Sequence, residues 1–386
     1  MHSESGTGWV VDTLPVEFRA LTECCQANFQ SSKSTPGTAR RSSGVRDILP
    51  CCGLDLDWQR FSVLCERHRV EGLAWHGLRV MDFAVPECVI SVLLEKSREI
   101  AQDGLKAAHA CDRIRSSFAV RRTPLLFLKG LAVGKLAYGD AFRKSASDID
   151  ILVSPDSLNE AASALRELGY RAVIPVCNDV AKLRRWHGLS KESTWVDISG
   201  SLRVELHTAL TDHRDLLPDV GVHSPQQAVT VMPGLDLATL AQDEMLVYLC
   251  VHGASSAWFR LKWIADFAGI ISGLTDLELN LLLDRGRELG AGRSVKQALL
   301  LACFLFPLLS FEAPLAVALR RDRTAMWLAR RSLAQLLAPE PTARAGGTLM
   351  IHLTQLMLFP GWRSASGELR RQLDQFWQTR HFGAAI

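Results

Sequence analysis

The sequence predicts an α+β protein in which a small mixed sheet lies between two helical regions. Two changes in hydrophobic spacing lead to this prediction. Apolar residues recur every three or four positions from residue 46 to 120, and again from residue 235 to the end, as they do in helices. From residue 121 to 212, short apolar runs end in glycine or polar turns, which is typical of strands. A chain of 386 residues exceeds one ordinary core, so several modules are expected.

The first 45 residues are expected to be a mobile segment and linker without chemistry. Residues 30–44, "QSSKSTPGTARRSSG", are small, polar and contain proline, a composition that buries little apolar surface. The helical region of residues 46–120 follows, with patterns such as "LDWQRFSVLCERHRVEGLAWHGLRV".

The central region, residues 121–212, is expected to alternate strands and helices. Ser154 followed by Pro155 is a good N-cap and first-turn pair for a helix. The expected elements are, in order, the strand "TPLLFLKG", the short helix "LAVGKLAYGD", the strand "SDIDILV", the helix "PDSLNEAASALRELGY", the strand "RAVIPV", and a hairpin of "STWVDIS" and "LRVELHTA" joined by a glycine turn. From residue 235 the chain is expected to be helical to near its end.

Composition gives broad limits on function. Lys and Arg number 44 against 41 Asp and Glu, so the net charge of +3 neither supports nor excludes nucleic acid as a partner. The longest apolar run, residues 298–309, has 12 residues and includes Pro307, which predicts a buried helix and no membrane span. The start lacks a signal-peptide pattern and no cysteines are spaced C-x-x-C, so we expect a cytoplasmic protein with reduced thiols.

Two aspartates interrupt the buried strand "SDIDILV". Residues i and i+2 of a strand point to the same face, so Asp148 and Asp150 project together while Ile149 and Ile151 face the core. Two convergent carboxylates do not both stay ionised at low cost unless a cation lies between them. Oxygen ligands of this kind suit Mg²⁺ or Mn²⁺ bound together with substrate phosphates.

Two further segments would complete such a site. Glu205, in the strand-like run "RVELHTA", offers the third carboxylate of a centre for phosphoryl or nucleotidyl transfer. Lys129 and Gly130 lie where a strand turns into a helix, a place where backbone N–H groups and a lysine can hold a phosphate.

These motifs resemble a known family. "LKG", "LAYGD", "SDIDILV" and "RVELH", followed by "LCVHGASSAWFRLKWIAD" from Leu249 to Asp266, are similar to the bacterial, largely uncharacterised branch of the nucleotidyltransferases of the DNA polymerase beta superfamily. The resemblance runs from roughly residue 50 to 280. In this chain Leu131 replaces the usual serine after Gly130, and Glu205 stands where aspartate is frequent.

The resemblance implies a nucleotidyltransferase core with a role for each motif residue. Asp148, Asp150 and Glu205 would bind Mg²⁺ or Mn²⁺, with Glu205 also the base for the acceptor. An NTP would be the co-substrate, and the expected nucleotide-binding residues are Lys129, Gly130, Arg143, Ser147 and Arg260.

Several of these residues also have structural interpretations. Arg143 could instead pair with Asp140 in the loop, and His207 could orient Glu205 or fill a polar gap. His187 has only a loose counterpart in the family. The segment Leu249–Asp266 could line the pocket or form a buried polar cluster that fixes a helix against the sheet.

The predicted reaction moves a nucleoside monophosphate from an NTP to a hydroxyl or phosphate of an unknown acceptor. A small metabolite or peptide, in natural-product biosynthesis, is the acceptor class that the resemblance suggests. The alternatives are a toxin-like enzyme acting on tRNA, for which residues 184–191 are the candidate basic strip, a phosphotransferase, and an inactive nucleotide-binding module.

Overall fold

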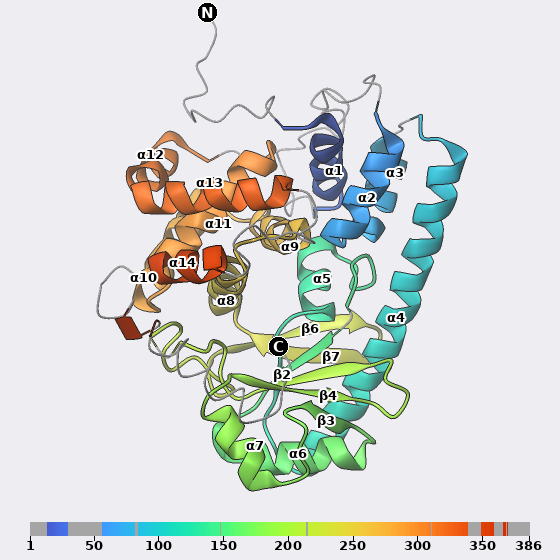
Figure 1. The fold of residues 1–386 in the computed structure, drawn as a ribbon, viewed down its shortest axis with the longest axis vertical. Coiled ribbons are helices and arrows are strands. Elements are labelled where there is room, and N and C mark those ends of the chain that lie inside the picture. The colour runs from blue at the N-terminus through green and yellow to red at the C-terminus, as the bar shows by residue number, and fades with distance from the viewer. Residues whose placement is uncertain are drawn as a thin grey trace, which may run out of the picture.

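The computed structural model has the predicted α+β class, with a small mixed sheet and helices on both sides of it (Figure 1). It describes residues 14–29, 56–81, 84–146, 148–213, 215–309, 311–338, 349–358, 366–367 and 369. The linker expected at residues 30–44 lies outside the described residues.

Helices form the N-terminal part of the described chain. Their bounds are α1 (Val16–Gln26), α2 (Trp58–His68), α3 (Glu71–Met81) and α4 (Glu87–Val120). Helix α1 falls inside the segment expected to be mobile, yet Phe18 and Leu21 are buried and the helix packs against α3. That expectation is therefore wrong for α1, because its apolar face is covered by other helices.

The central region contains a five-stranded sheet with the order β1-β2-β5-β4-β3. The strands are β1 (Leu126–Phe127), β2 (Asp148–Leu152), β3 (Arg171–Ile174), β4 (Glu192–Val196) and β5 (Arg203–His207). Strands β2 and β5 are parallel, and the other neighbouring pairs are antiparallel. The parallel pair sets Asp150 directly opposite Glu205.

Short helices connect these strands. The helix α5 (Leu131–Tyr138), the 3₁₀ turn η2 (Pro155–Ser157) and the helix α6 (Leu158–Glu167) lie where the sequence predicts helices, whereas α7 (Val180–His187) was not predicted. The Ser154 hydroxyl accepts a hydrogen bond from the Asp156 N–H, as its predicted capping role requires.

One sheet face carries a core of its own. Ile149, Ile151, Val204 and Leu206 pack there with apolar residues of α4 and α6. The opposite face of β2 and β5 turns toward the other helices, which share a second core with α1–α3. This division leaves one face of the parallel strands for polar side chains.

A second, two-stranded sheet was not predicted. Strands β6 (Gln226–Met232) and β7 (Leu235–Leu240) form an antiparallel hairpin, so the expected helical start at residue 235 is wrong. Their alternating apolar residues, including Val229, Val231 and Leu237, are buried in the sheet core. The hairpin contacts α5 and β1.

The rest of the described chain is helical. The helices are α8 (Gln242–Ser255), α9 (Leu261–Ile271), α10 (Asp276–Glu288), α11 (Gly292–Leu305), α12 (Ala313–Arg321), α13 (Arg323–Leu337) and α14 (Leu349–Leu358). As predicted, α11 ends before Pro307. Within the described chain, none of the helices has the length and apolar character needed to cross a membrane.

The segment Leu249–Asp266 is not one helix. Helix α8 ends at Ser255 and α9 begins at Leu261, with Ala257 and Trp258 in left-handed backbone conformations between them. The buried Trp258 ring lies so close to Gly253 that a Cβ there would come within 2.3 Å of it. This turn sets the angle between two helices that both face the polar side of the sheet.

Candidate functional site

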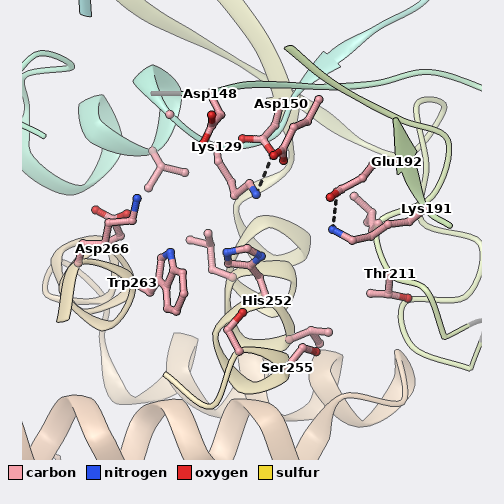
Figure 2. A pocket seen from close by; sticks show the side chains of 18 of the residues that line it. Lys129, Asp148, Asp150, Lys191, Glu192, Thr211, His252, Ser255, Trp263 and Asp266 are labelled. Atoms are coloured by element: carbon pink, nitrogen blue, oxygen red, sulfur yellow. Dashed lines mark hydrogen bonds and ion pairs between the residues drawn. The ribbon is translucent and has the colours of Figure 1, made fainter. Parts of the chain in front are cut away.

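A cavity of about 470 Å³ lies between the polar face of the sheet and helices α8 and α9. Its size falls within the range of small-molecule sites. Asp148, Asp150 and Lys129 gather on the sheet side, while His252 and Trp263 extend from α8 and α9 (Figure 2). Loop residues after β5, among them Thr211, close a further side.

The predicted carboxylates meet in this cavity. Asp148 and Asp150 occupy alternate positions of β2, and Glu205 lies on β5 opposite Asp150. All three line the cavity because the alternation of a strand sends them to the face that the core does not use. Arg203, opposite Asp148, brings its Nε within 3.8 Å of the Asp148 carboxylate.

The turn between β1 and α5 adds a lysine to this group. The Lys129 Nζ lies 2.8 Å from the Asp150 Oδ1. Gly130, which caps α5, has a φ of 60°, a conformation that favours glycine. The first turn of α5 thus begins beside the carboxylates, as the sequence predicts, with both turn residues lining the cavity.

His207 links the carboxylates from behind. It is buried, and its Nε2 lies 3.2 Å from Asp150 Oδ1 and 3.8 Å from Glu205 Oε2, with Nδ1 3.3 Å from Glu192 Oε2. Burial disfavours the charged imidazole, but hydrogen bonding to Asp150 and Glu205 raises the His207 pKa above its ordinary value. The histidine therefore orients the carboxylates, and Asp150 most closely.

The two facing carboxylates differ in their electrostatics. Burial raises the pKa of Asp150, but the Lys129 ammonium and His207 outweigh it and hold that pKa well below its usual range. The pKa of Glu205 is raised, first by burial and further by the Asp150 carboxylate. Glu205 thus carries a negative charge that its surroundings compensate poorly, and a cation would compensate it.

A divalent cation fits this donor set. Asp150, Glu205 and His207 each offer a ligand atom, and these atoms lie within 4.8 Å of one another. Carboxylate oxygens suit Mg²⁺ and Mn²⁺. Asp148, which the sequence predicts as a metal ligand, lines the same cavity but does not belong to this group of ligand atoms.

Helix α8, strand β4 and the loop after β5 form the side of the cavity away from the turn between β1 and α5. Lys191 Nζ lies 2.7 Å from Glu192 Oε2. Burial by itself would lower the Lys191 pKa, but Glu192 together with Tyr248 and Asp212 raises that pKa above its ordinary value. Burial and the nearby lysines Lys129 and Lys191 lower the His252 pKa well below its ordinary value. Its neutral ring meets the Trp263 ring edge to face, with centroids 5.4 Å apart.

The opposite end of the cavity is cationic. Arg69, Lys144 and Lys262 line it, together with Asp266. The Asp266 carboxylate pairs with Lys144 and accepts a hydrogen bond of 2.9 Å from the Tyr138 hydroxyl. Sequence analysis did not single out the three cations. Lys262 belongs to the quoted segment "FRLKWIAD", which was the available signal.

Two predicted nucleotide-binding residues point elsewhere. Arg143 is not among the cavity-lining residues, and its Nε lies 3.5 Å from Asp140 Oδ2, which is the alternative loop ion pair. Arg260 also lies outside the lining, and its guanidinium donates to the Arg67 carbonyl and stacks over Phe259. It therefore joins α9 to the end of α2.

The other residues that the sequence suggests for the site are Ser147, His187 and those of the segment Leu249–Asp266. Ser147 lies outside the described residues. His187 hydrogen-bonds the hydroxyls of Thr208 and Ser193 and does not line the cavity. In the segment Leu249–Asp266, both interpretations hold in part: His252, Trp263 and Asp266 line the cavity, whereas Trp258 is buried.

Comparison with known proteins identifies the family of this chain. No curated protein matches the chain. A family model described as "Uncharacterised nucleotidyltransferase" matches residues 55–307, which include α2, the whole sheet and the helices that enclose the cavity up to α11. Nucleotidyltransferases act on NTPs with divalent metals, and the match covers well over half of the chain. The chain therefore belongs to this family of uncharacterised nucleotidyltransferases.

Proposed function

We propose that the protein is a cytoplasmic, metal-dependent enzyme that transfers a nucleoside monophosphate from an NTP to a hydroxyl or phosphate of a small metabolite or peptide. Asp148, Asp150 and Glu205 would hold Mg²⁺ or Mn²⁺, and Lys129 and Gly130 would bind phosphate. The observation that carries the proposal is the meeting of three carboxylates from two parallel strands beside a glycine turn in one cavity.

The same arrangement supports a wider relationship. We infer that the family is a bacterial branch of the DNA polymerase beta superfamily, whose motifs the sequence resembles. A mixed sheet with acidic residues on neighbouring strands, and a helix that starts at a phosphate turn, supports this inference.

The proposed reaction assigns a task to each group. A bound divalent cation would neutralise phosphate charge and polarise the α-phosphate. Glu205, whose pKa is raised by burial, would accept the proton of the acceptor hydroxyl. The acceptor oxygen forms a bond to the α-phosphorus, the bond to the bridging oxygen breaks, and pyrophosphate leaves with the electron pair. Lys129 would stabilise negative charge on the phosphates.

The placement of the basic strip, residues 184–191, supports a small-molecule acceptor more than RNA. Arg184 and Arg185, in the basic strip, are exposed on α7 but do not line the cavity. Lys191, in the same strip, lies inside the cavity and is paired with Glu192. A continuous basic groove leading to the carboxylates, which RNA would require, is not formed by these residues.

The test is to incubate the purified protein with Mg²⁺, a host extract and NTPs labelled on either the α- or the γ-phosphate. We expect α-label, but no γ-label, in an acceptor, with release of pyrophosphate. Transfer of γ-label would indicate a phosphotransferase, and label in tRNA would overturn the proposed acceptor class.

Glu205→Gln separates catalysis from binding. The amide keeps the shape of the side chain but neither the charge nor the basicity. We expect transfer to fall by about two orders of magnitude, the range for loss of a positioned base, while NTP affinity changes little. Transfer at the wild-type rate would assign the base to another residue.

A further inference from the structure

The cavity has one region rich in carboxylates and another rich in cations. Asp148, Asp150 and Glu205 lie on the strands, whereas Arg69, Lys144 and Lys262 lie at the end formed by α9 and the C-terminus of α2 (Figure 2 shows Asp148 and Asp150 on the strand side and Asp266 at the other end). A ligand that combines a cation with a run of anionic groups would match both regions at once.

Ion pairs account for only part of the cationic end. Lys144 is buried and pairs with Asp266, which also accepts from Tyr138. Among the described residues, neither Lys262 nor Arg69 has an ion pair or a side-chain hydrogen bond within the structure. Among the described residues, these two positive charges thus border the cavity without an ion pair.

Lys262 is held in an unfavourable electrostatic position. Its pKa is lowered to about 8, first by burial and then by Lys144, Arg69 and Lys129, whose repulsion exceeds the attraction of Asp266. Placing an ammonium group where neighbouring cations repel it reduces stability unless a ligand with negative charge occupies the site. Residues kept at such a cost are common in binding sites.

The cationic end is continuous with the turn at Lys129 and Gly130, the proposed phosphate-binding turn. The Lys144 side chain packs against α5, since a Cβ at Gly134 would come within 3.2 Å of its Cγ. Helix α5 starts directly after its N-cap Gly130, and Lys129 contributes to the positive field at Lys262. Phosphates that extend beyond the turn along α5 would therefore meet Lys144 and Lys262 next.

We propose that Lys262, Arg69 and Lys144 form a polyphosphate subsite that binds the β- and γ-phosphates of the NTP and then the leaving pyrophosphate. This inference rests on the proposed function, because it assigns the pyrophosphate side of the same reaction. It makes Lys262 the binding residue with the largest effect, since its charge has no ion pair among the described residues and α9 directs it into the cavity.

The test measures binding of inorganic tripolyphosphate, with Mg²⁺ and without any acceptor, so its result does not depend on transfer. We expect the wild-type protein to bind it and Lys262→Met to bind it about ten- to a hundredfold more weakly, as expected for loss of a charge-assisted hydrogen bond. Lys262→Arg should stay within a few-fold of wild type because it keeps the charge.

Two further variants make the result specific. Arg69→Asn, which suits the left-handed backbone of that residue, should weaken binding several-fold, and Lys106→Met on the exposed surface of α4 should have no effect. Wild-type affinity in Lys262→Met, no tripolyphosphate binding by the wild type, equal loss in Lys262→Arg, or unfolding of Lys262→Met would each overturn the proposal. If tripolyphosphate binding fails these tests but the protein still transfers α-label from an NTP, the subsite is refuted and the proposed function stands.

Discussion

The two faces of β2 and β5 show how one pair of strands serves both stability and chemistry. On one face Ile151 and Leu206 are fully buried against helices. On the other, Asp150 and Glu205 sit opposite each other at the cavity. The same register aligns both sets, since side chains alternate along a strand.

The faces differ in what they contribute to folding. Burial of the apolar face stabilises the protein by about 25 cal/mol for each Å² removed from water. The polar face requires desolvated charges, which Lys129 and His207 compensate at Asp150 but which remain poorly compensated at Glu205. Substitutions on the polar face should therefore change activity first, and those on the apolar face should change stability first.

Asp150→Asn should produce the largest effect. Asp150 contacts Lys129 and His207 and belongs to the candidate metal group, so the change removes the most connected charge of the polar face. We expect transfer to fall by about three orders of magnitude, because metal charge stabilisation is worth several kcal/mol. Metal-dependent NTP binding should weaken as well.

Labelled-NTP transfer and NTP binding with and without Mg²⁺ would check this, with circular dichroism as a measure of folding. Asp112→Asn, an exposed aspartate of α4 paired with Arg115, is the matched control and should match wild type. If Asp150→Asn transfers at the wild-type rate, the polar face does not hold the reactive centre.

The alternation of side chains along β2, which separates its apolar face from its polar face, also made the carboxylates of the site predictable. The pattern D-I-D-I in β2 places carboxylates and core on opposite sides before any partner is known. The glycine turn before α5 was equally local, because its φ of 60° favours a residue without a Cβ. The β6–β7 hairpin had the same kind of signal around Pro233 and Gly234, and it was missed because the helical pattern that follows was extended too far back.

The remaining site residues could not be predicted because their direction depends on tertiary structure. Arg143 and Lys144 are neighbours in sequence, but only Lys144 lines the cavity. Arg260 and Lys262 are separated because α9 begins between them, after a turn with Trp258 in a left-handed conformation that β-branched and bulky residues rarely adopt. No local pattern encodes such a turn.

Ile151→Ala should have the next largest effect, and on stability. The side chain is fully buried in the sheet core, so truncation leaves a cavity and costs about 2 to 5 kcal/mol. Urea unfolding measures this loss, while transfer per folded molecule should stay within a few-fold of wild type. Ile198→Ala, at an exposed position, should change stability by less than about 0.5 kcal/mol. A large loss of activity without loss of stability would contradict the division between the faces.

Lys262 extends the comparison across the cavity to α9 and gives the smallest expected effect. On this helix Ile264 and Phe267 are buried in the core, while Lys262 and Asp266 face the cavity. Because the folded pKa of Lys262, about 8, is below the unfolded value near 10.4, the unfolded chain binds more protons between these pH values. The cost to stability is therefore fully present below pH 8 and decreases as the pH rises toward 10.

Lys262→Met removes this cost. Without ligand, the variant should be more stable than wild type at pH 7 by about 1 to 2 kcal/mol, less than the full pKa shift implies because solvent screens a partly exposed charge. The difference should shrink between pH 8 and 10, as wild type recovers stability. Urea unfolding of both proteins at pH 7, 8, 9 and 10 measures this difference. A variant less stable than wild type at pH 7 would mean that Lys262 stabilises the folded chain. The polar side of α9 would then differ from the polar face of β2 and β5, where desolvated charges reduce stability.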